Sequence, residues 1–129
     1  MATGLPAVTG DVLTAATFNG LVTFTVGTAN TADYTAVLAD AYQVLEVMNK
    51  ATAIAFKIPT DASVAFPVGT ALTVLNIGVG TCTISAVTPG TTTVLSAGAV
   101  AASPTLAQYK TAVCIKTGAN AWYVVGGIL

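Results

Sequence analysis

The chain has 129 residues, enough for one domain with its own core, but only nine side chains are formally charged and the net charge at neutral pH is −1. It contains no His and no Arg, which most often serve as general base, metal ligand and phosphate clamp, so we expect no enzyme, no metal site and no cofactor. Four lysines are too few to neutralise several phosphates, which excludes a nucleic-acid partner.

Residues 1–32 are predicted to form an N-terminal arm and a first strand, ahead of a β domain at residues 33–129. The arm begins with Pro and Gly residues, and Thr14 is suited to cap a short helical turn through residues 15–18. Residues 21–26 then alternate apolar side chains with Thr, which is typical of a strand. An apolar segment therefore precedes the β domain.

From residue 34 onward the pattern is almost entirely β. Apolar residues alternate with small or polar ones in short runs at intervals of about ten residues, and Pro, Gly and Asn separate the runs. This spacing favours an all-β fold, a compact antiparallel β-sandwich or barrel. The predicted strands are residues 42–48, 54–58, 71–77, 81–87, 112–116 and 121–125.

The segments around these strands carry further predictions. Residues 35–40 contain good helix formers in a short run, so we expect a turn or a single helical turn. Residues 88–104 are rich in Thr and Ala and are predicted to be a loop or a weak edge strand, and residues 117–120 are typical of a hairpin turn. The run 71–77 is apolar on both sides, as in a strand buried on both faces. No repeat of solenoid length is visible.

Two prolines bracket a loop after the strand at 54–58. Pro59 and Pro67 restrict the residues before them to extended conformations, which fixes the shape of the loop. We expect Phe66 to enter the core, and the alternative is that Phe66 and Pro67 contact a neighbouring subunit. Trp122 is expected in the core or at a subunit interface rather than stacked on a sugar.

The thiols and the remaining charged groups are expected to have structural roles. Cys82 and Cys114 lack a metal-binding spacing, so they are predicted to be small buried apolar residues or, in an oxidising compartment, a disulfide. Lys110 and Lys116 flank one strand and are expected to face solvent. Three carboxylates are spaced too widely for a calcium loop and are expected to be solvated or to cap a helix: Asp33, Asp40 and Glu46.

The mean hydropathy of +0.81 would suit a membrane protein. The uncharged stretch at residues 62–109 is nevertheless broken by Pro and Gly and is rich in Thr, so we expect no membrane partner. Residues 1–6 lack the basic region and apolar run of a secretory signal. We therefore expect the protein to be made and used in a cytoplasm.

Three motifs of the β domain can be compared with known patterns. Residues 38–41 read Leu-Ala-Asp-Ala, residues 58–70 read Ile-Pro-Thr-Asp-Ala-Ser-Val-Ala-Phe-Pro-Val-Gly-Thr, and residues 120–126 read Asn-Ala-Trp-Tyr-Val-Val-Gly. These motifs, the second above all, resemble a small β module of tailed-phage virion proteins, which occurs at the ends of tail fibres and in head-associated proteins. The resemblance covers residues 34–127.

The resemblance implies a virion structural protein that is assembled in the host cytoplasm. We expect a capsid decoration (cement) protein that binds the major capsid protein and stabilises the head shell. The alternative is a head- or tail-fibre protein that binds a host receptor or a glycan, although the chain has no long shaft to carry the module. A third reading is an unrelated self-assembling β protein.

Self-association and the arm complete the sequence-based expectations. Because so few charges cover the surface, and because phage proteins of this type are commonly trimeric, we expect a homotrimer. The apolar residues of the arm have no core of their own to enter, so we expect them to contact the capsid or a neighbouring subunit. The alternative is that the arm packs back on its own domain. The predicted contact residues are Leu5, Pro6, Val8, Val12, Leu13 and Phe18.

Overall fold

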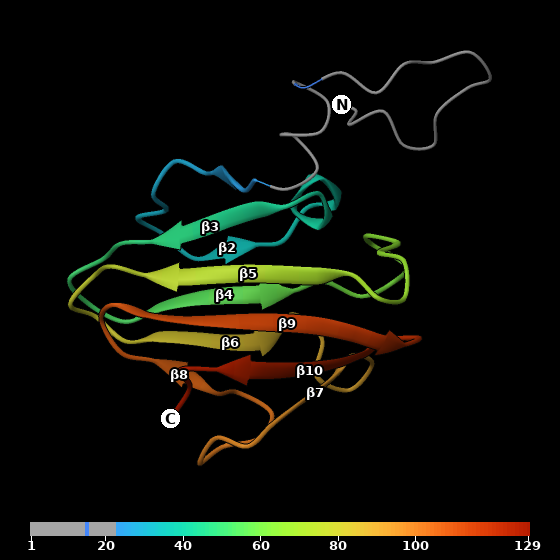
Figure 1. Cartoon of the computed structure of the whole chain (residues 1–129). Helices are drawn as coiled ribbons and strands as arrows, with labels where there is room; N and C mark the ends of the chain where they lie inside the picture. The colour runs from blue at the N-terminus through green and yellow to red at the C-terminus, as the bar shows by residue number, and fades with distance from the viewer. Residues whose placement is uncertain (1–14, 16–22) are drawn as a thin grey trace.

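The computed structural model describes residue 15 and residues 23–129, which form two β-sheets and one short 3-10 helix (Figure 1). The all-β fold predicted from the sequence is confirmed. Of the predicted N-terminal segment at residues 1–32, the structure describes Ala15 and residues 23–32, in which the predicted first strand appears only as the two-residue β1. The predicted helical turn lies outside the described residues except for Ala15.

Each sheet has its own set of strands. The six-stranded sheet has the order β1-β3-β5-β9-β10-β7 and the four-stranded sheet the order β2-β4-β6-β8. The first consists of β1 (Thr25–Val26), β3 (Val44–Met48), β5 (Ala71–Asn76), β9 (Lys110–Gly118), β10 (Ala121–Gly126) and β7 (Thr93–Ser96). The second consists of β2 (Tyr34–Thr35), β4 (Ile54–Ile58), β6 (Cys82–Ala86) and β8 (Thr105–Leu106).

The predicted strands agree closely with the observed ones. The prediction at residues 54–58 coincides with β4, three others differ from the observed strands by one or two residues at one end, and those at 81–87 and 112–116 differ at both ends. The two-residue strands β2 and β8 were not predicted. The hairpin between β9 and β10 is confirmed, with Asn120 at φ 49° in the left-handed region that such turns require. The predicted weak edge strand is β7, and the single helical turn is the 3-10 helix η1 (Leu38–Ala41).

The prediction of an antiparallel arrangement is wrong. Five of the eight strand pairs among the described residues are parallel. After each of the first four strands the chain crosses to the other sheet, and it then returns to pair in parallel with the strand it had left (Figure 1). Alternation of apolar residues is the same in parallel and antiparallel strands, so it could not distinguish the two. The separation in sequence between paired residues is not constant: Thr25 pairs with Val44, whereas Leu45 pairs with the more distant Thr73. Because successive passes of the chain differ in length, they produce no fixed repeat in the sequence.

The crossings between the sheets stack directly on one another. The Gly80 N–H donates to the Lys50 carbonyl at 2.9 Å, which joins the β5–β6 connection to the β3–β4 connection. A Cβ atom on Gly80 would overlap the Thr52 carbonyl oxygen, and one on Gly78 would overlap the backbone of Lys50. Glycine is therefore required here because another backbone approaches too closely for any side chain.

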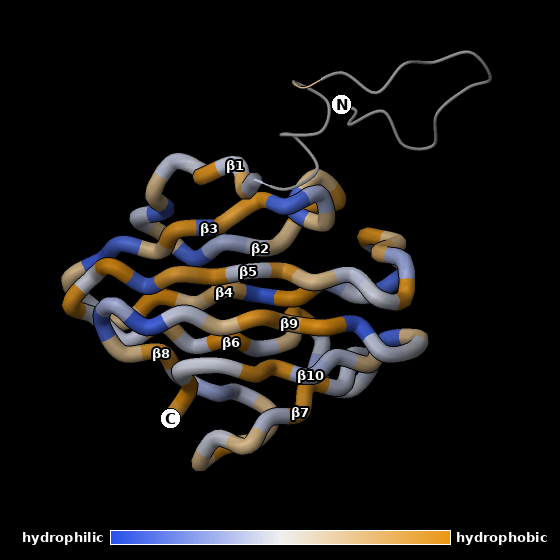
Figure 2. The backbone as a smooth tube through the Cα atoms, in the orientation of Figure 1, coloured by the Kyte–Doolittle hydropathy of each residue, from blue (hydrophilic) through white to orange (hydrophobic). Residues whose placement is uncertain are grey.

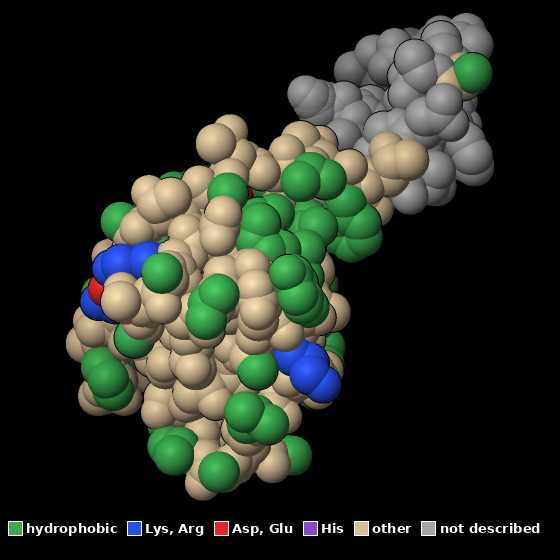
Figure 3. All heavy atoms as spheres, turned by 90° about the vertical axis from the view of Figure 1, so that its left-hand side faces the viewer, with side chains coloured by type: hydrophobic (Ala, Val, Ile, Leu, Met, Phe, Trp, Pro, Cys, Tyr) green, Lys and Arg blue, Asp and Glu red, His purple; other side chains and the backbone are tan. Residues whose placement is uncertain are grey.

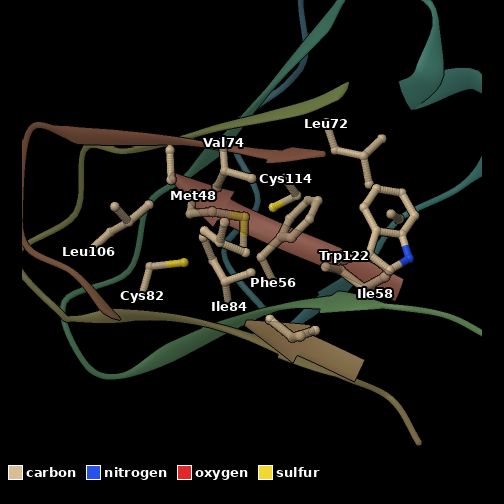
Figure 4. Packing of buried hydrophobic residues seen from close by; sticks show 14 of the residues in the cluster. Met48, Phe56, Ile58, Leu72, Val74, Cys82, Ile84, Leu106, Cys114 and Trp122 are labelled. Atoms are coloured by element: carbon tan, nitrogen blue, oxygen red, sulfur yellow. The ribbon is translucent and has the colours of Figure 1, made fainter. Parts of the chain in front are cut away.

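One apolar core lies between the two sheets (Figure 4). Trp122 and Leu72 enter it from the six-stranded sheet, opposite Phe56 and Ile58 of β4, and each is at most 1% exposed. The prediction that residues 71–77 are buried on both faces is wrong for the isolated chain. Alternate β5 side chains point into the core, whereas Thr73 and Leu75 remain partly exposed on the outer face.

The edges of both sheets are short. The edge strands β1, β2 and β8 have two residues each and β7 has four. The end of the chain also covers β8, because Ile128 bridges to Leu106 and the Leu129 N–H donates to the Thr105 carbonyl at 3.0 Å. Little unpaired backbone is left along either sheet.

Candidate functional site

The predicted contact residues of the arm lie outside the described residues. They are Leu5, Pro6, Val8, Val12, Leu13 and Phe18. The first described contacts after the arm run along β3. The N–H groups of Thr25, Gly27 and Asn30 donate to carbonyls of Gln43, Leu45 and Val47 at 2.8–3.0 Å. The chain therefore enters the six-stranded sheet at its β1 edge, and the domain boundary between residues 32 and 33 stays a prediction.

The loop between β4 and β5 places its two candidate residues differently. Phe66 is 3% exposed and packs edge-on against Trp122, with ring centroids 5.5 Å apart and planes at 90°. Both side chains belong to the core of this chain, so neither offers a surface to a neighbouring subunit or a sugar. Pro67 and Val68 are exposed, as are Ala62, Ser63, Ala65 and Gly69, so Pro67 lies on a part of this loop that a partner can reach.

The same loop is fixed by a buried ion pair. The Lys116 ammonium lies 2.8 Å from Asp61 Oδ1 and donates to the Phe66 carbonyl at 2.6 Å. The Asp61 carboxylate also accepts the Asn120 N–H at 3.0 Å, and the Asn120 side chain accepts the Asp61 N–H at 2.9 Å. The hydrogen bond from Lys116 lowers the pKa of Asp61 below its ordinary value.

The expectation that Lys116 faces solvent is wrong. Its side chain is 4% exposed, because position 116 falls on the inward face of β9 together with Ala112 and Cys114. Lys110, at the other end of β9, is exposed as expected. A lysine at a strand end usually faces solvent, and the sequence shows no sign that Asp61, 55 residues earlier, would reach it.

A second polar cluster lies where β2, η1 and β3 meet. The Tyr34 hydroxyl donates to Asp40 Oδ2 at 2.8 Å, and the Val37 N–H donates to the same oxygen at 3.0 Å, so Asp40 caps η1. The Asn30 amide donates to Glu46 Oε1 at 3.1 Å. Both carboxyls are buried, Asp40 at 3% and Glu46 at 7% exposure. Burial and the neighbouring Asp40 carboxyl raise the pKa of Glu46 to about 7.

This raised pKa predicts that stability falls as pH rises. The folded chain keeps a proton on Glu46 that the unfolded chain releases above its ordinary pKa of 4.5, so the extra stability is full below about pH 4.5 and is lost as pH rises through 7. We expect the free energy of unfolding to drop by about 2–3 kcal/mol between pH 5 and pH 8. Glu46→Gln should flatten this slope in urea titrations.

The control for that experiment is Asp33→Asn. Asp33 is more than half exposed, forms a 3.9 Å ion pair with Lys57 and accepts the Ala55 N–H at 3.0 Å, a hydrogen bond that the side-chain oxygen of Asn can keep. This variant should therefore keep the wild-type slope. A wild-type protein whose stability does not change between pH 5 and pH 8 would contradict the prediction.

The two cysteines are free thiols inside the core. Burial raises the pKa of Cys82 to about 11 and that of Cys114 to about 12. The thiolate is the reactive form of cysteine, so neither group is activated for attack on a substrate or for binding a metal. The predicted role as small buried apolar residues agrees with their positions (Figure 4).

The outer face of the six-stranded sheet carries two continuous rows of uncharged side chains. The strand registers align Val26, Leu45, Thr73, Val113 and Val125 across β1, β3, β5, β9 and β10. They also align Ala71, Ile115, Tyr123 and Leu95 across β5, β9, β10 and β7. We call these nine residues the outer apolar face. Figure 2 shows apolar segments of β9 and β10 next to each other.

Several side chains of this face are exposed, and they differ from other exposed apolar residues, such as Val79 and Tyr109, in belonging to continuous rows. Val26 is 66% exposed, Val125 49%, Tyr123 47% and Leu95 42%. Near the β7 side, Leu95, Tyr123 and Val125 line a shallow apolar hollow. The outer face of the four-stranded sheet is different, because it carries Lys57 with its partner Asp33 and the hydroxyls of β6. Seen from one end of the strands, the molecule shows charged side chains in only a few small areas (Figure 3).

Comparison with known proteins gives no relative: no family model, no curated protein and no solved structure matches the chain. Within residues 23–129 and residue 15, no helix is long and apolar enough to cross a membrane. Over the same residues, no three His, Cys, Asp or Glu side chains gather into a group able to hold a metal ion.

Proposed function

We propose that the chain is a capsid decoration protein of a tailed phage, which sits as a homotrimer on the outer shell and stabilises contacts between major capsid subunits. The observation that carries this proposal is the outer apolar face, because an exposed, uncharged face of this extent suits permanent burial against protein. The motif at residues 58–70, which resembles that of tailed-phage virion proteins, also supports it. The Asp61–Lys116 pair holds the loop of this motif in one shape.

In this proposal the two sheets act as a rigid β-sandwich, and the part of residues 1–32 that precedes β1 acts as an arm that reaches neighbouring subunits. A catalytic role is not part of it, because the chain has no His or Arg and both thiols are buried. A net charge of −1 gives no useful long-range attraction. Binding must therefore rest on apolar contacts and hydrogen bonds. Three arms on one lattice site increase the overall affinity, because binding of one arm raises the effective concentration of the other two.

The test is capsid binding by a variant without the arm. Deleting residues 2–19 removes the apolar residues predicted to contact the shell. We expect a folded protein that no longer sediments with expanded, undecorated capsids of the parent phage. The full chain should bind equally well between about 50 and 500 mM salt, because charge-driven contacts would weaken over that range.

The double variant Leu13→Asp/Phe18→Asp keeps the full length and serves as a second probe. It should also lose binding, whereas Val68→Asp at the exposed loop tip should retain it. Capsid binding by the truncated protein at wild-type strength would refute the role of the arm. Binding of the full chain to host cells, without binding to shells, would favour the fibre function instead.

A further inference from the structure

We propose that the outer apolar face is the surface through which copies of this chain associate, with three such faces turned toward a common axis. The inference deepens the proposed homotrimer and takes its copy number from it. It assigns the contact to one face of one sheet, apart from the arm that the proposed function assigns to the capsid.

The chemistry of the face selects an uncharged partner. Its nine residues carry no charge, and the row through Val26, Thr73 and Val125 offers methyl groups and one hydroxyl. A charged partner would lose hydration here without gaining a counter-charge. A second copy presents the same uncharged surface, so each copy satisfies the requirement of the other.

The size of the face is sufficient for association. Beside the nine residues, the same side of the sheet carries a third uncharged row, Val47, Leu75 and Thr111. The five strands from β3 to β7 span about 24 Å at about 4.8 Å per strand, and the six residues of β5 that cross the three rows span about 20 Å. Each face therefore measures roughly 480 Å², and two faces together bury roughly 1,000 Å², the lower limit for a specific interface. The exposed rings and methyl groups of Tyr123 and Val125 add to this projected area.

The width of the face also fits a three-fold arrangement. Three sheets, each about 24 Å wide, close into a triangular prism in which every sheet lies about 7 Å from the central axis. Side chains fill about 5 Å of this distance, because stacked sheets lie about 10 Å apart and the side chains of the two sheets share that gap. Tyr123 is long enough to fill the remaining space. One row ends in Leu95 on β7, and the other extends past β3 to Val26 on β1, so an exposed apolar side chain lies at each edge of the six-stranded sheet.

The sequence supplies an independent argument. β5 carries apolar side chains on both faces, a pattern typical of strands covered on both sides. In the single chain only the face of Leu72 and Val74 is covered, while Thr73 and Leu75 lie on the outer face. Association through this face gives the strand the two-sided burial that its sequence indicates.

The experiment measures the mass of the full-length protein by multi-angle light scattering at micromolar concentration. The wild type should give about three times 12.8 kDa. Val125→Lys should give about one times that mass, because three ammonium groups would meet near the axis. The matched control is Val79→Lys, which makes the same change at a 74% exposed position on the β5–β6 connection and should stay trimeric. Circular dichroism and thermal unfolding verify that both variants fold.

Each other outcome would overturn the inference or part of it. A monomeric wild type, or a Val125→Lys protein that still forms trimers, would refute the face as the self-association surface. A dimer that Val125→Lys dissociates would refute the three-fold arrangement. The capsid assay separates this inference from the proposed function: a trimer that Val125→Lys dissociates but that ignores capsids supports the face and refutes the decoration role. A monomer that loses capsid binding on Val125→Lys would mean that the shell, and not a second copy, covers the face.

Discussion

Replacing Gly80 with Ala is expected to lower the free energy of unfolding by about 3–5 kcal/mol, the largest effect of any methyl addition considered for this chain. The added Cβ would overlap the Thr52 carbonyl oxygen, which is backbone and cannot rotate away. Separating the two connections would also weaken the hydrogen bond from Gly80 to Lys50, and the one from the buried Asn76 amide to the Gly80 carbonyl at 2.9 Å. Urea unfolding followed by fluorescence of the single Trp measures the loss.

Gly90→Ala is the matched control for this experiment. No atom lies within 4 Å of a Cβ built at Gly90, and its φ lies outside the left-handed region. The control should therefore change stability by less than about 0.5 kcal/mol. Equal stabilities for the two variants would show that the connections do not stack as described.

Lys116→Met is expected to cost about 3 kcal/mol. The substitution keeps the length of the side chain but leaves the Asp61 carboxylate and the Phe66 carbonyl without their cation. Breaking a buried pair from one side costs about 3–5 kcal/mol, and the partial exposure of Asp61, at 28%, favours the lower end. Lys110→Met, at the exposed end of the same strand, should cost less than about 0.5 kcal/mol.

The pH dependence provides a second readout for this pair. Because the pKa of Asp61 is lowered in the folded chain, its contribution is present above the ordinary pKa of 3.8 and is lost as pH falls. Lys116→Met should reduce this loss on acidification, and the double variant with Asp61→Asn should recover part of the stability. If Lys116→Met alone were as stable as the wild type, the pair would have no role in holding the loop.

Strand positions could be predicted from the sequence because each strand buries one face. The alternation in residues 54–58 places Ile54, Phe56 and Ile58 in the core, and this period of two fixes both the strand and its inward side. Pairing could not be predicted in the same way. The β3–β4 and β5–β6 connections contain Gly, Asn and Thr, as ordinary hairpin turns do, yet they cross from one sheet to the other. Only the close backbone approach at Gly80 distinguishes these connections from hairpins.

The candidate sites were predictable to different degrees. Phe66 in the core followed from the two prolines that fix its loop, and the hairpin at Asn120 followed from its turn residues. The Lys116–Asp61 pair depends on two residues far apart in the chain, and such a contact leaves no local pattern. The outer apolar face has one local signal in the sequence, the two-sided apolar character of residues 71–77, which predicts a strand buried on both faces.

The short edge strands have a consequence for solubility at high concentration. A chain with so few charges lacks the lysines that usually keep exposed sheet edges from pairing with other molecules. The edge strands of the described residues are only two to four residues long, and Ile128 and Leu129 cover β8. These short edges leave too little unpaired backbone to serve as a template for a growing fibril. At high concentration the folded chain is therefore expected to resist edge-to-edge growth into amyloid-like polymers.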